Sequence, residues 1–198
     1  MNPTFNIKNV TLNIHTYQRE PAFVALGAAL AAATATPTPG PVEPTDIPAL
    51  GEYWPGEGGK NGGYVPARGD VPAHYLIIAA DDVGKRAWGG YGSESKALSK
   101  TDGLANSRAL AESDADYSAA QAAGEYTADG HGDFYLPSAA ELYQAWVNCP
   151  DLFAKEWYWS STQRSAYLAF IQHFGDGGQD NTGKSYEFLV RPVRRLFI

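Results

Sequence analysis

The pattern of apolar and polar positions divides the chain into three parts. Residues 5–14 alternate between apolar and polar side chains and change register near Asn9, which predicts a strand with a bulge. Residues 22–33 are almost wholly apolar, whereas residues 34–48 are rich in Pro and Thr and have little to bury. We therefore expect an N-terminal attachment segment, a stiff extended linker and a domain, at residues 1–33, 34–48 and 49–198.

The domain contains one strong strand signal and one strong helix signal. Residues 74–80 (HYLIIAA) form a short apolar run, which predicts a buried strand. Ser138 lies three residues before Glu141, a spacing that predicts a capping box at the start of a helix. Leu142 and the apolar residue four positions later share one face of that helix, which we expect to end before Pro150.

The remaining parts of the domain have weaker patterns. Residues 51–70 are dense in Gly and Pro, which predicts turns. Residues 104–125 are Ala-rich with apolar residues at mixed helical spacing, so they fit one helix or two short ones. From residue 151 onward we expect short strands and loops. The fold class predicted by these segments is α+β.

Charge and cysteine content exclude several kinds of function. The net charge of −7 and the pI near 5.0 argue against nucleic-acid binding, which needs clustered Lys and Arg. One cysteine, Cys149, excludes an intramolecular disulfide and a cysteine-based zinc site. Residues 22–33 are too few to cross a bilayer about 30 Å thick as a helix. We favour a small apolar helix or an assembly contact there, with a secretory signal as the alternative, and we expect no membrane span.

Three loops carry residues with candidate chemistry. Residues 56–61 (GEGGKN) lack the spacing of a phosphate-binding loop, so we expect a flexible turn. Residues 129–133 (DGHGD) have the side chains to hold a metal or orient a base, although hydrogen bonding within the loop is the favoured role. Residues 176–181 offer oxygen ligands for calcium, but such residues are common in Gly-rich loops that bind no metal.

The C-terminal strand carries a dense basic patch made of Arg191, Arg194 and Arg195. A basic run is usually solvated, but arginines in a β-rich terminus also clamp carboxylates in bidentate pairs. We favour this structural role, with Glu141 or Glu187 as partners.

No arrangement of residues indicates catalysis. Ser160 and Ser161 lack the glycine pattern of a nucleophile elbow, so packing and backbone hydrogen bonds are their expected roles. No partner that would activate Cys149 as a nucleophile is apparent. We expect a protein that is not an enzyme and that has no metal site and no cofactor.

The motifs DGHGDFYLPSAAEL, WYWSSTQ and VRPVRR follow one another in the domain. Together they resemble the C-type-lectin-fold domains of phage tail proteins and bacterial surface proteins, in the branch of that fold related to formylglycine-generating enzymes. The resemblance covers roughly residues 50–198 and implies a C-type lectin fold with short strands, two helices and long loops. The chain lacks the Glu-Pro-Asn and Trp-Asn-Asp motifs of calcium-dependent lectins and the cysteine pair of the related enzymes, so neither of those chemistries is expected.

Within this family the chain is similar to the variable proteins of diversity-generating retroelements, in which mutation of adenines randomises asparagine codons. Such an AAY codon never becomes Lys, Glu, Gln, Met or Trp. Guided by the resemblance, we assign these residues as an invariant framework: Ser160, Ser161, Thr162, Gln163, Ser165, Ala166, Ala169, Gln172, Phe174, Asp176, Gly177, Gln179, Lys184 and Glu187. The sixteen positions between them all obey the codon rule: Arg164, Tyr167, Leu168, Phe170, Ile171, His173, Gly175, Gly178, Asp180, Asn181, Thr182, Gly183, Ser185, Tyr186, Phe188 and Leu189.

The resemblance implies a receptor-binding protein at the fibre tip or baseplate of a phage tail. The predicted ligand-binding residues are Arg164, Tyr167, Leu168, Phe170, Ile171, His173, Asp180, Asn181, Thr182, Ser185, Tyr186 and Phe188. The expected partners are a host cell-surface receptor, protein or glycan, and other tail proteins that bind residues 1–45. Several copies on one particle, or a homo-oligomer, would raise avidity.

Three alternatives remain to the receptor-binding interpretation. A structural virion protein would use the same fold for assembly. A secreted bacterial adhesin would place the protein outside the cell or on its surface. In an ordinary irregular β-region, the same aromatic residues would fill a core.

Overall fold

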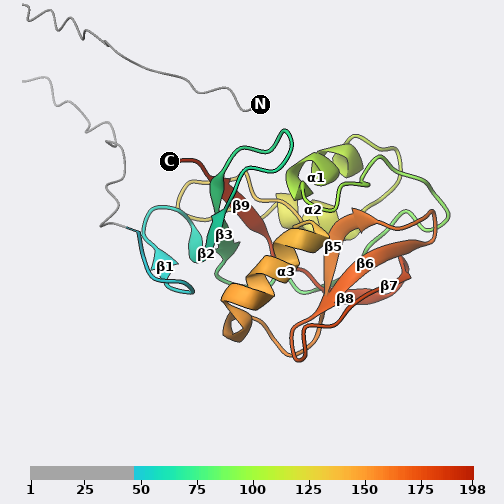
Figure 1. Ribbon diagram of the computed structural model, residues 1–198. Coiled ribbons are helices and arrows are strands. Elements are labelled where there is room, and N and C mark those ends of the chain that lie inside the picture. Colours follow the sequence, from blue (N-terminus) through green and yellow to red (C-terminus); the bar gives the residue numbers. More distant parts are fainter. Residues whose placement is uncertain (1–46) are drawn as a thin grey trace, which may run out of the picture. The chain divides into compact units, whose positions relative to one another are not determined.

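The computed structural model describes residues 47–198, which form a mixed α+β structure with three α-helices and two sheets (Figure 1). The predictions for residues 1–33, and for residues 34–46 of the linker, lie outside the described residues. The strands are β1 (Tyr53–Trp54), β2 (Gly59–Val65), β3 (His74–Ala79), β4 (Lys85–Ala87), β5 (Trp157–Gln163), β6 (Leu168–His173), β7 (Gln179–Gly183), β8 (Glu187–Leu189) and β9 (Val193–Leu196). The helices are α1 (Gly103–Ala111), α2 (Ser118–Gly124), α3 (Ala139–Asn148) and a short 3₁₀ helix (Pro150–Leu152).

The first sheet has the strand order β1-β2-β3-β9, and all its pairs are antiparallel. The strand predicted from the apolar run at residues 74–80 is confirmed as β3, which lies between β2 and β9. Because β9 pairs with β3, the C-terminal strand lies beside a strand more than 100 residues earlier in the chain, with Ile77 opposite Arg194. This pairing holds the C-terminal arginines inside the structure.

Strand β2 corrects the prediction that residues 51–70 are mainly turns. The glycines of β2 permit close contact with β3, a role that the sequence pattern did not separate from turn formation. A Cβ atom on Gly59 would meet the backbone oxygen of Ile78, and one on Gly62 would lie 2.9 Å from the Ile78 side chain. A larger residue at either position would push the two strands apart.

The second sheet has the strand order β4-β8-β5-β6-β7. Strands β5, β6 and β7 form an antiparallel meander, whereas β8 runs parallel to β5. Figure 1 shows strands β5 to β8 of this sheet, in orange and red, on the opposite side of α3 from β2 and β3. Four of its five strands, β5 to β8, lie in residues 157–189, which contain the predicted framework and variable positions.

Helix α3 confirms the clearest helix prediction. Ser138 Oγ accepts a hydrogen bond from Glu141 N, and Glu141 Oε2 accepts one from Ser138 N at 2.7 Å, which completes the capping box. The helix contacts β2 of the first sheet and both β5 and β6 of the second. One hydrophobic core lies around it and includes Leu76, Leu142 and Tyr158.

The Ala-rich segment forms two short helices, so the domain has three α-helices rather than the two expected. Asp102 caps α1, since its Oδ1 atom accepts a hydrogen bond from Ala105 N at 2.9 Å. Residues 113–116 (SDAD) separate α1 from α2, because Ser and Asp compete with helical hydrogen bonding through their own side chains. The break places Tyr117 against Trp88 in a second core.

Candidate binding face

Eight of the fourteen predicted framework positions are buried, whereas Asp176, Gln179 and Glu187 are exposed and the other three are partly exposed. The buried ones are Ser160, Ser161, Thr162, Gln163, Ala169, Gln172, Phe174 and Lys184. Their burial is unusual because five of them are uncharged polar residues, which need hydrogen-bond partners inside a protein.

The predicted variable positions are exposed or partly exposed, with Ile171 as the exception. Its side chain is 6% exposed and packs in the core that contains Trp159, so it does not form part of an accessible face. Phe188 is partly buried against the same core, with its ring 5.0 Å from the Trp159 ring. The sequence did not separate these two residues from the exposed variable positions, because both obey the codon rule.

The hairpin of β6 and β7 separates the predicted contact residues onto two faces. Ile171 lies opposite Asp180 on the face that includes the Trp159 core. Phe170 lies opposite Asn181 on the other face, where Lys100 Nζ is 5.8 Å from the centre of the Phe170 ring.

Helix α3 begins beside this second face of the hairpin. Gln179, which shares the face of Asn181, donates a hydrogen bond from its Nε2 atom to Ala139 O at the start of the helix. Leu168 lies on the same face as Phe170 by strand alternation. The twelve predicted residues therefore do not form one continuous surface.

The most exposed predicted residues gather where the strands end. We call Arg164, Tyr167, Ser185 and Tyr186 the tip cluster; all four are exposed, Tyr167 by 54% and Tyr186 by 61%. A hydrogen bond from Lys184 N to Tyr167 O, at 3.0 Å, joins the two loops that carry them. Residues separated by about twenty positions thus lie side by side at one end of the sheet.

The opposite end of β6 carries a second polar group of predicted residues. His173 Nδ1 lies 2.7 Å from Asp176 Oδ1, and the His173 ring lies 4.9 Å from the Trp157 ring. Asp176 also accepts a hydrogen bond from Gly178 N, and these contacts hold the pKa of its carboxyl below the usual value. Within residues 47–198 no group of three or more His, Cys, Asp or Glu side chains is placed to hold a metal ion.

Lys184 is a buried cation beneath the tip cluster. Its Nζ atom donates to Ser93 O and to Gln163 Oε1, both at 2.8 Å, and lies 4.6 Å from the centre of the Trp88 ring. Burial lowers the pKa of Lys184 to about 8, although the carboxylate of Glu94 opposes this shift. The lysine joins β5, the loop after β7 and the loop before residue 95.

The hydroxyl groups of β5 are engaged in packing and hydrogen bonds, as expected. Ser160 Oγ donates to Phe170 O, and Thr162 Oγ1 donates to Ser99 O, both at 2.9 Å. Ser161 Oγ accepts a hydrogen bond from Asn106 Nδ2 at 3.2 Å. These contacts hold a bulge in β5, at which its register against β6 shifts.

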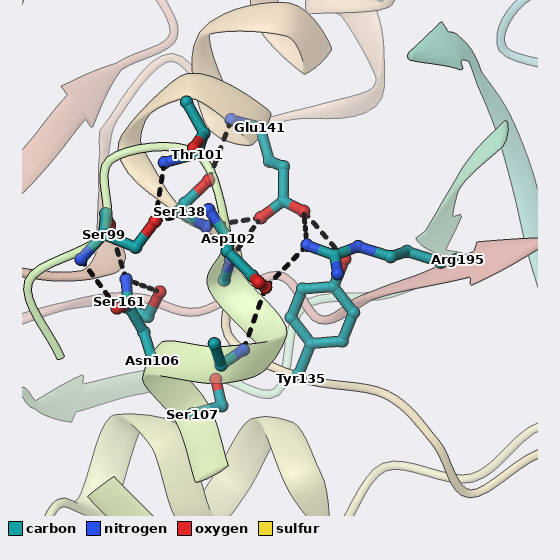
Figure 2. Close-up of polar contacts among 12 residues, drawn as sticks. Ser99, Thr101, Asp102, Asn106, Ser107, Tyr135, Ser138, Glu141, Ser161 and Arg195 are labelled. Atoms are coloured by element: carbon teal, nitrogen blue, oxygen red, sulfur yellow. Dashed lines mark hydrogen bonds and ion pairs between the residues drawn. The ribbon is translucent and has the colours of Figure 1, made fainter. Parts of the chain in front are cut away.

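Arg195 contacts Glu141, as predicted, but through one nitrogen atom rather than in the bidentate pair expected from the sequence. Figure 2 shows its guanidinium beside the carboxylates of Glu141 and Asp102, with Nη2 to oxygen distances of 3.0 and 2.9 Å. Glu141 also accepts hydrogen bonds from Tyr135 Oη and from the backbone N–H groups of Ser138 and residue 103. Burial raises the pKa of Tyr135 well above its ordinary value. Ala139 N also donates a hydrogen bond to Thr162 Oγ1, so residues of all three sequence motifs meet at the start of α3, and this network is structural.

The other two arginines have partners that the sequence did not indicate. Arg191 pairs with Asp82, and Arg194 Nη1 lies 2.7 Å from Glu57 Oε2. Both arginine side chains are buried. Glu187, the alternative partner considered from the sequence, is exposed on β8 and has no ion pair among the described residues.

The loop at residues 129–133 forms hydrogen bonds, as favoured from the sequence. Asp129 Oδ2 accepts from Tyr53 Oη at 2.7 Å and from two glycine N–H groups in the turn between β1 and β2. These bonds, chiefly the one from Tyr53, lower the pKa of the Asp129 carboxyl. His131 Nε2 lies 2.9 Å from Gly56 O in the same turn. The loop therefore fastens β1 and β2.

The cysteine lies at the end of α3 in a buried position. Cys149 Sγ lies 3.5 Å from Asn61 O, and burial raises the pKa of the thiol. A raised pKa reduces the thiolate fraction, which is the reactive form of the side chain.

Tyr91 is an exposed aromatic residue that sequence reasoning missed. It is 61% exposed, and its ring centre lies 5.3 Å from that of Tyr167 in the tip cluster. Its loop has no hydrophobic periodicity, and the available signal was the setting of an aromatic residue among three glycines at 89, 90 and 92. An exposed aromatic residue in such a loop is typical of a contact site.

The comparisons with protein families and with curated proteins do not assign a function to the chain, so the proposal below rests on the geometry. No protein-family model matches the chain, and no curated protein sequence matches it. Across residues 47–198, the helices are all too short or too polar to cross a membrane.

Proposed function

We propose that residues 49–198 form a C-type-lectin-fold binding module and that the protein is a receptor-binding protein at a phage tail fibre tip or baseplate. The observation that carries the proposal is a difference in burial between the two sets of positions in residues 160–189. Eight of the fourteen framework positions are buried, whereas every position that obeys the AAY codon rule, except Ile171, is exposed or partly exposed.

The physical basis of this arrangement is that the two sets of residues affect different properties. Substitutions at exposed positions away from caps, turns and ion pairs usually change stability by less than about 0.5 kcal/mol. The tip cluster therefore accommodates different side chains, while the framework around Lys184 and Gln163 keeps the loops in place. A surface built in this way can change its specificity without losing its fold.

The side chains now present suit contact with another molecule. Tyr and Arg are enriched among the residues that dominate binding energy, and the tip cluster contains two tyrosines and one arginine. The hydroxyls and the thiol described above are bound to neighbours or buried, so the module is proposed to bind without catalysing a reaction.

The proposed partners are a host cell-surface receptor and other proteins of the virion. The receptor contacts the exposed face, and residues 1–45 attach the module to the tail. Several copies on one particle raise the avidity of a weak individual site.

The diversification part of the proposal is tested in the genome that encodes the chain. We expect an imperfect repeat of the 3′ coding region beside a reverse transcriptase gene, with adenines in the repeat at mismatched codons. These codons should fall on exposed positions such as Tyr167 and Tyr186 and leave the codon of the buried framework residue Phe174, which contains no adenine, unchanged. A repeat whose mismatches fall equally on buried framework codons, or the absence of any repeat, would contradict diversification.

A further inference from the structure

We propose that Tyr91 is a permanent contact residue of the binding face, although it lies outside the diversified segment, and that the face recognises a folded protein surface. This inference rests on the proposed receptor-binding function. It adds a part of the face that stays constant while the tip cluster changes.

Tyr91 and Tyr167 form one exposed aromatic surface from two distant parts of the chain. Their ring centres are 5.3 Å apart and the ring planes meet at 65°. Both rings are more than half exposed, and the Tyr167 ring also lies within van der Waals distance of the Cβ position of Gly92. A pair of large aromatic residues in contact at the surface provides contact area at low cost in side-chain entropy.

The loop at residues 89–95, which carries Tyr91, is fixed by the framework and does not depend on Tyr167. Gly92 N donates to Ala166 O at 3.0 Å. Ala166 N and Gln163 Nε2 donate to the two oxygens of Glu94, at 3.1 and 2.7 Å. These bonds use backbone atoms and framework side chains, so they persist when residue 167 is another amino acid.

The buried lysine fastens the same loop from below. Lys184 Nζ donates to Ser93 O, while Gly89 N donates to Lys184 O. A Cβ atom on Gly89 would lie 2.2 Å from Asp116 O, and the φ angle of Gly89 is +92°, so the loop needs glycine at this position. The position of Tyr91 is thereby set before a ligand binds, which lowers the entropy lost on binding.

The shape and composition of the surface favour a protein ligand over a glycan. The rings of Tyr91 and Tyr167 meet edge to face at 65°, so together they offer apolar surface in two orientations, which suits the uneven surface of a protein better than one flat sugar ring. Exposed Ser93, Arg164 and Ser185 lie in the loops around the rings. Tyr, Ser and Gly are enriched in the binding loops of antibodies, where Arg occurs at positions that dominate the binding energy, and many antibodies recognise protein surfaces.

The test uses the full-length chain displayed on yeast with the four codons of the tip cluster randomised as AAY-derived sets. The library is selected separately on lysozyme and serum albumin as protein probes, and on chitin oligosaccharides and mannan as glycan probes. Each selected clone then receives Tyr91→Ala, Tyr91→Phe or the control Tyr64→Ala. Tyr64 is a matched control, because it is 56% exposed and its ring lies 5.5 Å edge to face from Tyr75 on the first sheet.

We expect the selection to yield clones that bind the protein probes. In most of these clones, Tyr91→Ala should raise the dissociation constant about tenfold or more. Tyr91→Phe and Tyr64→Ala should change the dissociation constant by no more than about threefold. Equal effects of Tyr91→Ala and Tyr64→Ala would overturn the role of Tyr91 while the proposed function stands. Clones that bind glycans alone would overturn the protein ligand, and a library without binders would contradict the proposed function together with this inference.

Discussion

Lys184 Nζ lies 2.8 Å from Gln163 Oε1, and both side chains are buried. The pair joins the end of β5 to the loop after β7, and the same ammonium group holds Ser93 O in the loop that carries Tyr91. One buried ammonium group thus joins three segments whose exposed side chains form the proposed binding face.

The first prediction concerns the pH dependence of stability at Lys184. Its pKa is about 8 in the folded protein and about 10.5 in the unfolded chain, so between these values the unfolded chain binds more protons. The free energy of unfolding of the wild type, relative to Lys184→Met, should therefore rise with pH from about 8 to 10, by up to about 1.4 kcal/mol per pH unit. Urea unfolding of both proteins at pH 7, 8, 9 and 10 measures this difference, and a difference that falls with pH would refute the account of Lys184.

The second prediction concerns the carboxylate of Glu141. Tyr135 and Arg195 donate to one of its oxygens, and two backbone N–H groups donate to the other. In Glu141→Gln the amide NH₂ group replaces one of the two oxygens and faces donor groups in either orientation of the side chain. Because two donors cannot bond with each other, the free energy of unfolding should fall by about 3 kcal/mol or more. The control Glu187→Gln, at an exposed position, should change it by less than about 0.5 kcal/mol. Similar denaturation midpoints for the two variants would show that the network contributes little.

The third prediction concerns the thiol of Cys149. Because the side chain is buried and its pKa is raised, alkylation by iodoacetamide at pH 8 should be at least about tenfold slower in the native protein than in the denatured one. Mass spectrometry of samples taken over time measures both rates. Equal rates would mean that the end of α3 opens readily to solvent.

The fourth prediction separates residues of the face from residues of the core. Replacing Tyr167 and Tyr186 together by Ala should lower the free energy of unfolding by less than about 1 kcal/mol, since both side chains are largely exposed. Phe188→Ala should cost about 2 kcal/mol or more, because this ring packs against Trp159. Thermal melts in which the double variant is the less stable would place the two tyrosines in the core.

Local signals in the sequence predicted the elements that depend on neighbouring residues. The capping box of Ser138 and Glu141 and the apolar run of β3 are of this kind, and both were confirmed. The division of residues 104–125 into two helices was left open, since propensity over a few residues does not decide it. A contact between the C-terminal arginines and Glu141 was also predicted, because arginines in a β-rich terminus often clamp carboxylates, although Arg195 reaches Glu141 through one nitrogen atom rather than in a bidentate pair.

The rest depended on contacts between distant residues. Gly59 allows β2 to approach β3, but the same glycine in a sequence equally indicates a turn. The burial of Ile171 depends on which face of β6 the core covers, which the codon rule does not encode. The contact of Tyr91 with Tyr167 joins residues 76 positions apart, and only the folded chain brings them together.

The central claim, that the exposed end of the second sheet binds the receptor, is tested most directly by competition for the host cell. Purified full-length protein is added in excess to cells of the host, the parent particles are added next, and the particles that adsorb to the cells are counted. A variant with Ala at Arg164, Tyr167, Ser185 and Tyr186 is compared with a variant that carries Ala at four exposed residues elsewhere: Tyr64, Tyr143, Val147 and Leu50. We predict that wild type and the second variant block adsorption and that the tip variant, though equally folded, does not. Equal blocking by both variants would contradict the assignment of the binding face.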